Sequence, residues 1–167
     1  MRCVNGSSLV KQASGIQIDG DTRLWKHKKY ELPQDAPLIT GALFRLMYYE
    51  MMIHLKPLPV ILAGIREISH EGSSPLSREE VMIKLDKLWR ACGFGMVHLL
   101  RNPRPCLRRS LVLYRWCQKN GVDSRLFVGA GKDKDILKGH AWISVYGQIY
   151  REDPVLLARE YTVMLEG

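Results

Sequence analysis

The stretch that decides the fold reads Gly139-His-Ala-Trp-Ile-Ser-Val-Tyr-Gly-Gln-Ile-Tyr-Arg-Glu-Asp153. Tyr146-Gly147 divides it into two runs that are rich in aromatic and β-branched residues, as strands are. A two-residue connection that contains glycine is typical of a β-hairpin. We therefore predict two antiparallel strands, over residues 140–146 and 148–152.

A further strand and a helix are expected just before this hairpin. Residues 124–128 alternate between polar and apolar side chains, which predicts a strand. Residues 129–138 are polar and contain glycines and lysines, so a loop is expected there. Pro105 suits the start of a helix, and Asn120-Gly121 suits its end.

Helical patterns dominate the preceding part of the chain. Apolar residues recur at helical spacing from residue 41 onward, and Thr40 is placed to cap that helix. Pro57 must end it. A short apolar helix is expected over residues 60–68, and Ser77-Arg-Glu-Glu80 matches a capping box at the start of a third helix.

These elements together predict one compact α+β domain, which 167 residues suffice to build. Residues 1–40 form an N-terminal extension with a possible small hairpin around Asp19-Gly20. Residues 41–100 form a helical region. Residues 101–167 supply a helix followed by antiparallel strands.

Composition points to a soluble globular protein, with 46% apolar and 25% charged residues. No stretch has the roughly 18–20 uninterrupted apolar residues of a membrane span. The first residues lack the apolar core of a signal peptide, so we expect the cytoplasm. The net charge of +8 would suit an acidic partner. However, the basic residues are spread out and match no nucleic-acid motif, so we expect a solvated surface and no nucleic-acid partner.

The four cysteines are Cys3, Cys92, Cys106 and Cys117, and no two of them form a Cys-x-x-Cys pair. A zinc site is therefore not expected, and a reducing compartment argues against disulfides. A metal cluster of Cys92, His98 and Cys106 is conceivable, but its spacing fits no standard zinc pattern. Cys92 and Cys117 lie on apolar helix faces and are expected in the core. We predict neither a metal nor another cofactor.

Cys106 has a different context, because it follows Pro105 directly and falls in the first turn of a predicted helix. The unpaired N–H groups of a first turn and the helix dipole place positive charge at the thiol. Such surroundings lower the pKa of a thiol and favour the nucleophilic thiolate. Cys106 is therefore a candidate nucleophile, with a buried structural cysteine as the alternative.

A nucleophilic thiol needs a base and a group that orients the base. If Tyr146-Gly147 is the turn, His140 lies opposite Asp153, with Cβ atoms about 4.5–5.5 Å apart. An imidazole and a carboxylate at that spacing can hydrogen-bond. If the turn is shifted by one residue, Asp153 faces Trp142 instead. In the first register, Glu152 is expected on the opposite face from His140.

Three segments together resemble one family. They are Cys106-Leu-Arg-Arg-Ser-Leu-Val-Leu-Tyr-Arg-Trp, Asn120-Gly-Val-Asp-Ser-Arg-Leu-Phe-Val-Gly129 and Gly139-His-Ala-Trp-Ile-Ser-Val-Tyr-Gly-Gln148. This ordered set resembles the transglutaminase-like leader peptidase of lasso-peptide biosynthesis, and the similarity covers about residues 89–153. The resemblance implies a transglutaminase- or papain-like cysteine peptidase core.

The resemblance also implies a function. Cys106, His140 and Asp153 fall on the positions of the family's Cys-His-Asp triad. Such enzymes remove the leader from a ribosomally made precursor peptide, often one with a threonine just before the last leader residue, and a separate cyclase then joins the new N-terminal amine to an Asp or Glu side chain. Residues 1–40 are too short for a complete recognition domain. The resemblance therefore implies the split form, with a separate leader-recognition protein as partner and the cyclase as a possible second partner.

The sequence departs from the family where Ser144 replaces a commonly acidic residue. It does not assign the second oxyanion donor, for which Trp89 and Asn102 are candidates. Trp142 suits hairpin packing, with a substrate-side shield over the catalytic pair as the alternative. Two rival functions also remain. One is an acyltransferase that uses an amine as acceptor, and the other is a non-catalytic basic peptide-binding module.

Overall fold

The computed structural model describes residues 34–67, 76–98, 106–133 and 136–167. The hairpin expected around Asp19-Gly20, and Asn102, lie outside these residues. The elements, in chain order, are α2 (Ala36–Leu55), α3 (Leu58–Arg66), α4 (Arg78–His98), α5 (Cys106–Lys119), β1 (Ser124–Asp133), β2 (Ile136–Val145), β3 (Gln148–Ile149), α6 (Pro154–Glu160) and β4 (Thr162–Glu166). The predicted α+β class is therefore confirmed.

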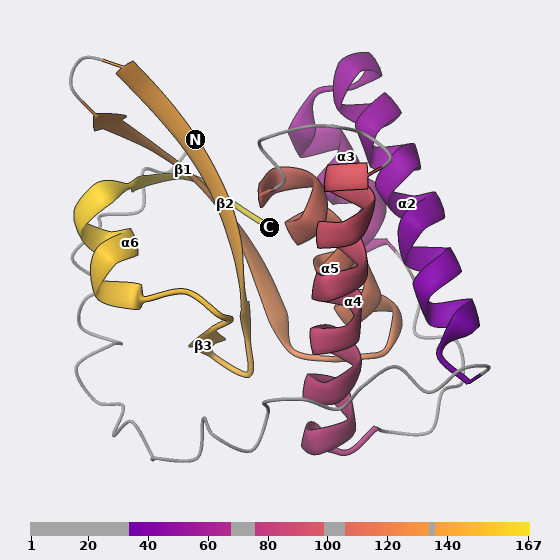
Figure 1. Cartoon of the computed structure of the whole chain (residues 1–167). Coiled ribbons are helices and arrows are strands. Elements are labelled where there is room, and N and C mark those ends of the chain that lie inside the picture. Colours follow the sequence, from indigo (N-terminus) through magenta and orange to yellow (C-terminus); the bar gives the residue numbers. More distant parts are fainter. Residues whose placement is uncertain (1–33, 68–75, 99–105, 134–135) are drawn as a thin grey trace.

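The sheet separates two layers of helices (Figure 1). Helices α2 to α5 gather on one side of it, and α6 lies on the other side. The main hydrophobic core lies on the four-helix side, where α5 packs directly on β1 and β2. A small second cluster of Phe127, Trp142 and Leu157 is buried elsewhere, with Leu157 contributed by α6. The N-terminal end of α5 thus lies against a strand that has buried side chains on both faces.

The sheet is antiparallel in the order β3-β2-β1-β4. The β1–β2 pairing runs without a break from Ser124↔Val145 to Asp133↔Ile136, so the loop expected over residues 129–138 is wrong. The glycines there permit close packing rather than a loop, since a Cβ on Gly129 would lie 2.9 Å from the Trp142 ring. Pairing across a long hairpin has overridden the low strand propensity of these residues.

The hairpin turn at Tyr146-Gly147 is confirmed. Both residues have positive φ, 52° and 77°, and Val145 pairs with Gln148. The second strand is much shorter than predicted, because β3 contains only two residues. Along most of its length, β2 therefore has no strand on the side away from β1 within the described part of the chain.

The helix boundaries follow local chemistry. Ser77 and Glu80 form the predicted capping box, in which each main-chain N–H donates to the other residue's side chain. The predicted cap at Thr40 is wrong, since α2 begins at Ala36 with Pro37 in its first turn. Thr40 instead donates its hydroxyl to the carbonyl of Ala36 at 2.8 Å. Among the described helices, none combines the length and the apolarity needed to cross a membrane.

Candidate active site

Cys106 is the first residue of α5 and lies against the edge of β2. Its sulfur accepts hydrogen bonds from the main-chain N–H groups of Leu107 and Ala141. One turn further along α5, the Ser110 hydroxyl donates to the Ala141 carbonyl at 2.9 Å. The thiol is thus held at a helix start, as the sequence predicted, and is also attached to the strand that carries His140.

His140 joins the thiol to a carboxylate. Its ring hydrogen-bonds the Cys106 side chain, and its Nε2 lies 2.6 Å from Oε2 of Glu152. About a fifth of the His140 side chain and about a quarter of the Glu152 side chain are exposed. The structure therefore brings a thiol, an imidazole and a carboxylate into one hydrogen-bonded row at the edge of the sheet.

The pKa values of the first two groups shift in opposite directions. Burial raises the pKa of the Cys106 thiol, but the bonds from His140 and from the main-chain N–H of Ala141 outweigh burial, so the net pKa is lowered. The bonds to Cys106 and then to Glu152 raise the pKa of His140 to about 9, although burial opposes them. Both shifts favour a thiolate paired with an imidazolium.

The expected pairing of His140 with Asp153 is wrong, although the predicted register is right. Pairing stops at Ile149, and Arg151 adopts a positive φ of 60° that turns the chain. This turn brings Glu152 to the imidazole. The Asp153 carboxylate instead accepts from the N–H groups of Val155, at 2.8 Å, and Leu156. Asp153 therefore caps α6, with Pro154 in the first helical position.

Sequence reasoning missed Glu152 because it extended the strand through residue 152. An Asp-Pro pair is also a helix-start signal, with aspartate as the cap and proline at the first helical position. Such a start commits the Asp153 carboxylate to main-chain N–H groups. That signal could have pointed to the preceding Glu152 as the free acid.

Trp89 lies beside this row rather than in it. The guanidinium groups of Arg109 and Arg151 lie over its ring, 4.4 and 4.6 Å from the centroid. Arg151 also pairs with the Asp86 carboxylate. Burial lowers the pKa of Arg109, and the nearby Glu152 opposes that shift. Trp89 thus anchors the turn that presents Glu152.

Aromatic rings cover the other flank of His140. Trp142 is buried and stacks on Phe127 and on His140, with centroids 5.9 and 5.8 Å apart. Its position agrees with the packing interpretation, and it also borders the imidazole. Tyr161, which the sequence did not single out, lies 5.1 Å from the His140 ring. Tyr161 directly precedes β4, and only the tertiary fold brings its ring to the imidazole of His140.

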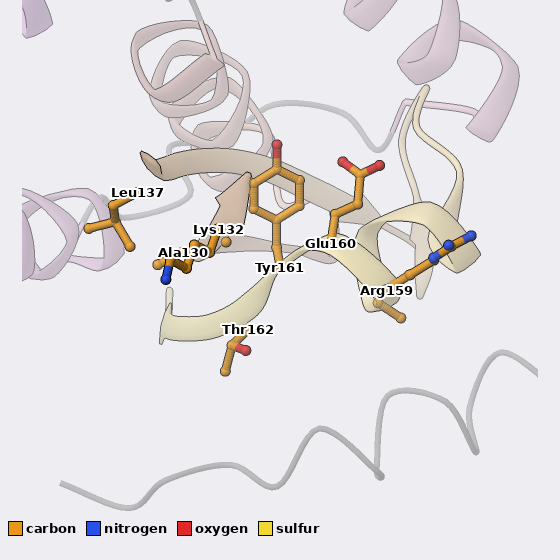
Figure 2. Close-up of a pocket in the computed structure, with 9 residues that line it drawn as sticks. Ala130, Lys132, Leu137, Arg159, Glu160, Tyr161 and Thr162 are labelled. Atoms are coloured by element: carbon orange, nitrogen blue, oxygen red, sulfur yellow. The ribbon is translucent and has the colours of Figure 1, made fainter. Parts of the chain in front are cut away.

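Tyr161 also lines an open pocket of about 390 Å³ (Figure 2). In Figure 2 the side chains of Glu160 and Tyr161 rise on the same side of the chain, whereas Thr162 points the opposite way. The lining residues come from β1, β2, α6, the residue that joins α6 to β4, and the start of β4: Ala130, Gly131, Lys132, Leu137, Ala158, Arg159, Glu160, Tyr161 and Thr162. Tyr161 therefore connects the imidazole with a hollow that contains both basic and acidic groups.

Comparison with known families identifies the superfamily of the chain. Residues 63–166, more than half of the chain, match the transglutaminase-like superfamily. The chain belongs to this superfamily. No curated protein and no solved structure matches it. Membership supplies a scaffold that is used by cysteine peptidases and acyltransferases.

Within this transglutaminase-like domain, the other described cysteines have different surroundings. Cys92 and Cys117 are fully buried, as predicted, and burial raises the pKa of each thiol to about 12. In the described residues, no three His, Cys, Asp or Glu side chains lie close enough together to hold a metal ion. Of these three thiols, Cys106 alone has its pKa lowered.

Proposed function

We propose that this transglutaminase-like protein is a cysteine peptidase that removes the leader from a ribosomally made precursor peptide of the lasso type. The observation that carries the proposal is the row in which Cys106 meets His140 and Nε2 of His140 meets Glu152. Cys106 is the nucleophile and His140 is the base. Glu152 takes the orienting role that the sequence assigned to Asp153.

Glu152 occupies Nε2, so proton exchange with the thiol uses the other ring nitrogen. The thiolate attacks the scissile carbonyl carbon, and the carbonyl oxygen becomes an oxyanion. The N–H groups of Leu107 and Ala141, which hold the sulfur in the free enzyme, are the nearest main-chain donors for the developing charge. Glu152 keeps the imidazolium aligned and stabilises its charge.

Collapse of the tetrahedral intermediate breaks the C–N bond. The imidazolium of His140 gives its proton to the leaving amine, and the acyl group stays on the sulfur as a thioester. The neutral imidazole then takes a proton from water while that water attacks the thioester. Leader acid and core amine are released, and the free thiol is restored.

The surface supports a protein partner in addition to the peptide. α2 exposes apolar side chains at helical spacing along one stripe: Phe44, Met47, Tyr48, Met51 and Leu55. Exposed apolar surface of this kind marks protein interaction sites. We propose a separate leader-recognition protein as the partner, with the ring-closing cyclase acting on the released core. A working thiol also fits the reducing cytoplasm.

Product masses test this function. The protein, a precursor peptide and its recognition partner are incubated together, and the products are weighed by mass spectrometry. Hydrolysis adds one water across one peptide bond. A product that joins two molecules would instead show an acyltransferase on the same scaffold. An intact precursor, together with a slow reaction of Cys106 with iodoacetamide, would favour a non-catalytic binding module.

A further inference from the structure

Every second residue of β2 turns its main-chain groups away from β1, as an antiparallel ladder requires. Two hydrogen bonds fix which residues these are. The N–H of Tyr146 donates to the carbonyl of Asp123 on the β1 side, at 2.9 Å. The carbonyl of Ile143 accepts from the N–H of Tyr150 on the opposite side, at 2.9 Å. The odd-numbered residues from 137 to 145 therefore present N–H and C=O groups along the outer edge.

Different neighbours cover the upper part of this edge. Val145 pairs with β3, and Ile143 receives the bond from Tyr150. At Ala141, the carbonyl accepts from Ser110 and the N–H donates to the sulfur of Cys106. Below Ala141, no main-chain partner on the outer side is seen for Gly139 or Leu137 among the residues that the structure describes. The uncovered part of the edge thus begins directly beside the nucleophile.

This part of the edge is also accessible. Gly139 is exposed, and a Cβ built on it would meet nothing within 4 Å. The side chains of Leu137 and Ile136 are 77% and 65% exposed. Proteins normally cover or charge such an edge because it can pair with another chain. An accessible strand edge beside a reactive thiol is therefore suited to receiving an extended peptide.

We propose that the edge of β2 at Leu137–Gly139 docks the peptide substrate as an added strand. This inference rests on the proposed function of Cys106. Residues two apart in a strand are about 7 Å apart, so a segment paired with Gly139 carries a nearby peptide bond to the sulfur beside Ala141. Strand addition uses main-chain bonds for affinity and pockets for alternate side chains.

The fold provides a pocket for those side chains. The His140 ring contacts the ring of Tyr161, and Tyr161 also lines the open pocket (Figure 2). Every second side chain of an added strand would face this side of the sheet. Arg159 and Glu160 in the lining suit polar or charged side chains. The edge therefore selects an extended backbone, and the pocket selects among side chains.

A scan of main-chain methylation on reactive peptide probes tests the pairing. The probes are acetyl-trialanine chloromethyl ketone and iodoacetyl-trialanine amide, which extend to opposite sides of the reacting carbon. In each reaction the thiolate of Cys106 displaces the halide. Methylating an amide that donates to the edge should slow labelling about tenfold, and methylating the next amide should change it less than twofold. Equal effects at all positions, or none, would overturn the proposal.

Gly139→Pro tests the same contact from the enzyme side, because proline removes the N–H that faces outward. The variant should lose about tenfold in labelling by the better probe and should keep its iodoacetamide rate. Met164→Ala on β4, the opposite edge of the sheet, is the control, since it shortens an exposed side chain away from the docking edge and keeps the main-chain groups. Circular dichroism checks that both variants are folded. An unchanged peptide rate in folded Gly139→Pro would contradict strand addition.

A second measurement does not depend on the thiol. In Cys106→Ala, millimolar acetyl-tetraalanine amide should slow hydrogen exchange at the Gly139 amide at least fivefold, and exchange there without protection would overturn the proposal. Protection at Gly139 combined with slow iodoacetamide labelling of the wild type would reject Cys106 as the nucleophile. The same result would support the docking edge.

Discussion

Helix α5 has a cysteine near each end, and the pKa values of the two thiols shift in opposite directions. Cys106 in the first turn has a lowered pKa, because hydrogen bonds from His140 and from main-chain N–H groups outweigh its burial. Cys117 in the last turn is fully buried, and its pKa is raised to about 12. Both residues are cysteines, so the difference in their pKa comes from their positions on the helix and from contact with the neighbouring strand. Position therefore decides which thiol is reactive.

Replacing each thiol in turn gives the largest contrast. Cys106→Ala should reduce precursor cleavage at least about 10⁴-fold, because no other group replaces the nucleophile. Cys117→Ala should keep cleavage within about threefold and lower the free energy of unfolding by about 1–2 kcal/mol, since it leaves a small cavity. Product masses and denaturant unfolding are the measurements. Cleavage at wild-type rate in Cys106→Ala would exclude the proposed mechanism.

The adjacent acids Glu152 and Asp153 give the next contrast. Glu152→Gln should lower the rate of cleavage roughly 10²–10⁴-fold, because the amide no longer stabilises the imidazolium. Asp153→Ala removes only the cap of α6 and should cost about 1 kcal/mol of stability. Cleavage rates and unfolding curves separate the two effects. A larger catalytic loss in Asp153→Ala would restore the assignment made from the sequence.

The pH dependence of alkylation sharpens the comparison between the thiols. Wild-type Cys106 should react with iodoacetamide well below the pH at which an ordinary thiol ionises, because its pKa is lowered. In His140→Ala the thiolate loses its partner, so its pKa rises and the rate at pH 7 should fall about tenfold. Peptide mapping after alkylation measures each cysteine, and Cys92 and Cys117 should stay unlabelled in the folded protein.

The ionisation of His140 also affects the stability of the folded protein. The folded pKa of His140, about 9, lies above its unfolded value of about 6.5. The stabilisation from His140 is therefore complete below pH 6.5 and is lost as the pH rises through about 9. Unfolding curves of the wild type should show this loss, whereas His140→Ala should show a flatter dependence over the same range. Equal slopes for the two proteins would contradict the raised pKa.

The smallest effect is expected at the ring that supports Glu152. Trp89→Leu removes the surface under Arg109 and Arg151, and should cost about 1 kcal/mol of stability. If Arg151 positions Glu152, cleavage should also fall a few-fold and the pH profile should shift towards that of Glu152→Gln. Arg125→Ala is the control, because its exposed pair with Glu166 contributes at most about 1 kcal/mol. An unchanged pH profile in the Trp89 variant would show that Trp89 contributes to packing and does not position Glu152.

Local signals in the sequence predicted much of this fold. The capping box at Ser77 and Glu80 and the turn at Tyr146-Gly147 depend on neighbouring residues, and both were predicted correctly. The loop predicted over residues 129–138 was wrong, because pairing between distant strands decides that region. A glycine-rich stretch resembles a loop locally, and only the packed Trp142 ring explains why glycine is required at residue 129.

The sequence by itself determined the residue types, the helix start at Cys106 and the order of Cys106 before His140, because these follow from the linear order of residues and short-range chemistry. Only the tertiary structure decided that Glu152, and not Asp153, reaches the imidazole. The reason is that pairing in β3 stops after two residues and a left-handed Arg151 then redirects the chain. Such a choice depends on how well Arg151 packs on Trp89, a contact between residues that are far apart in the sequence.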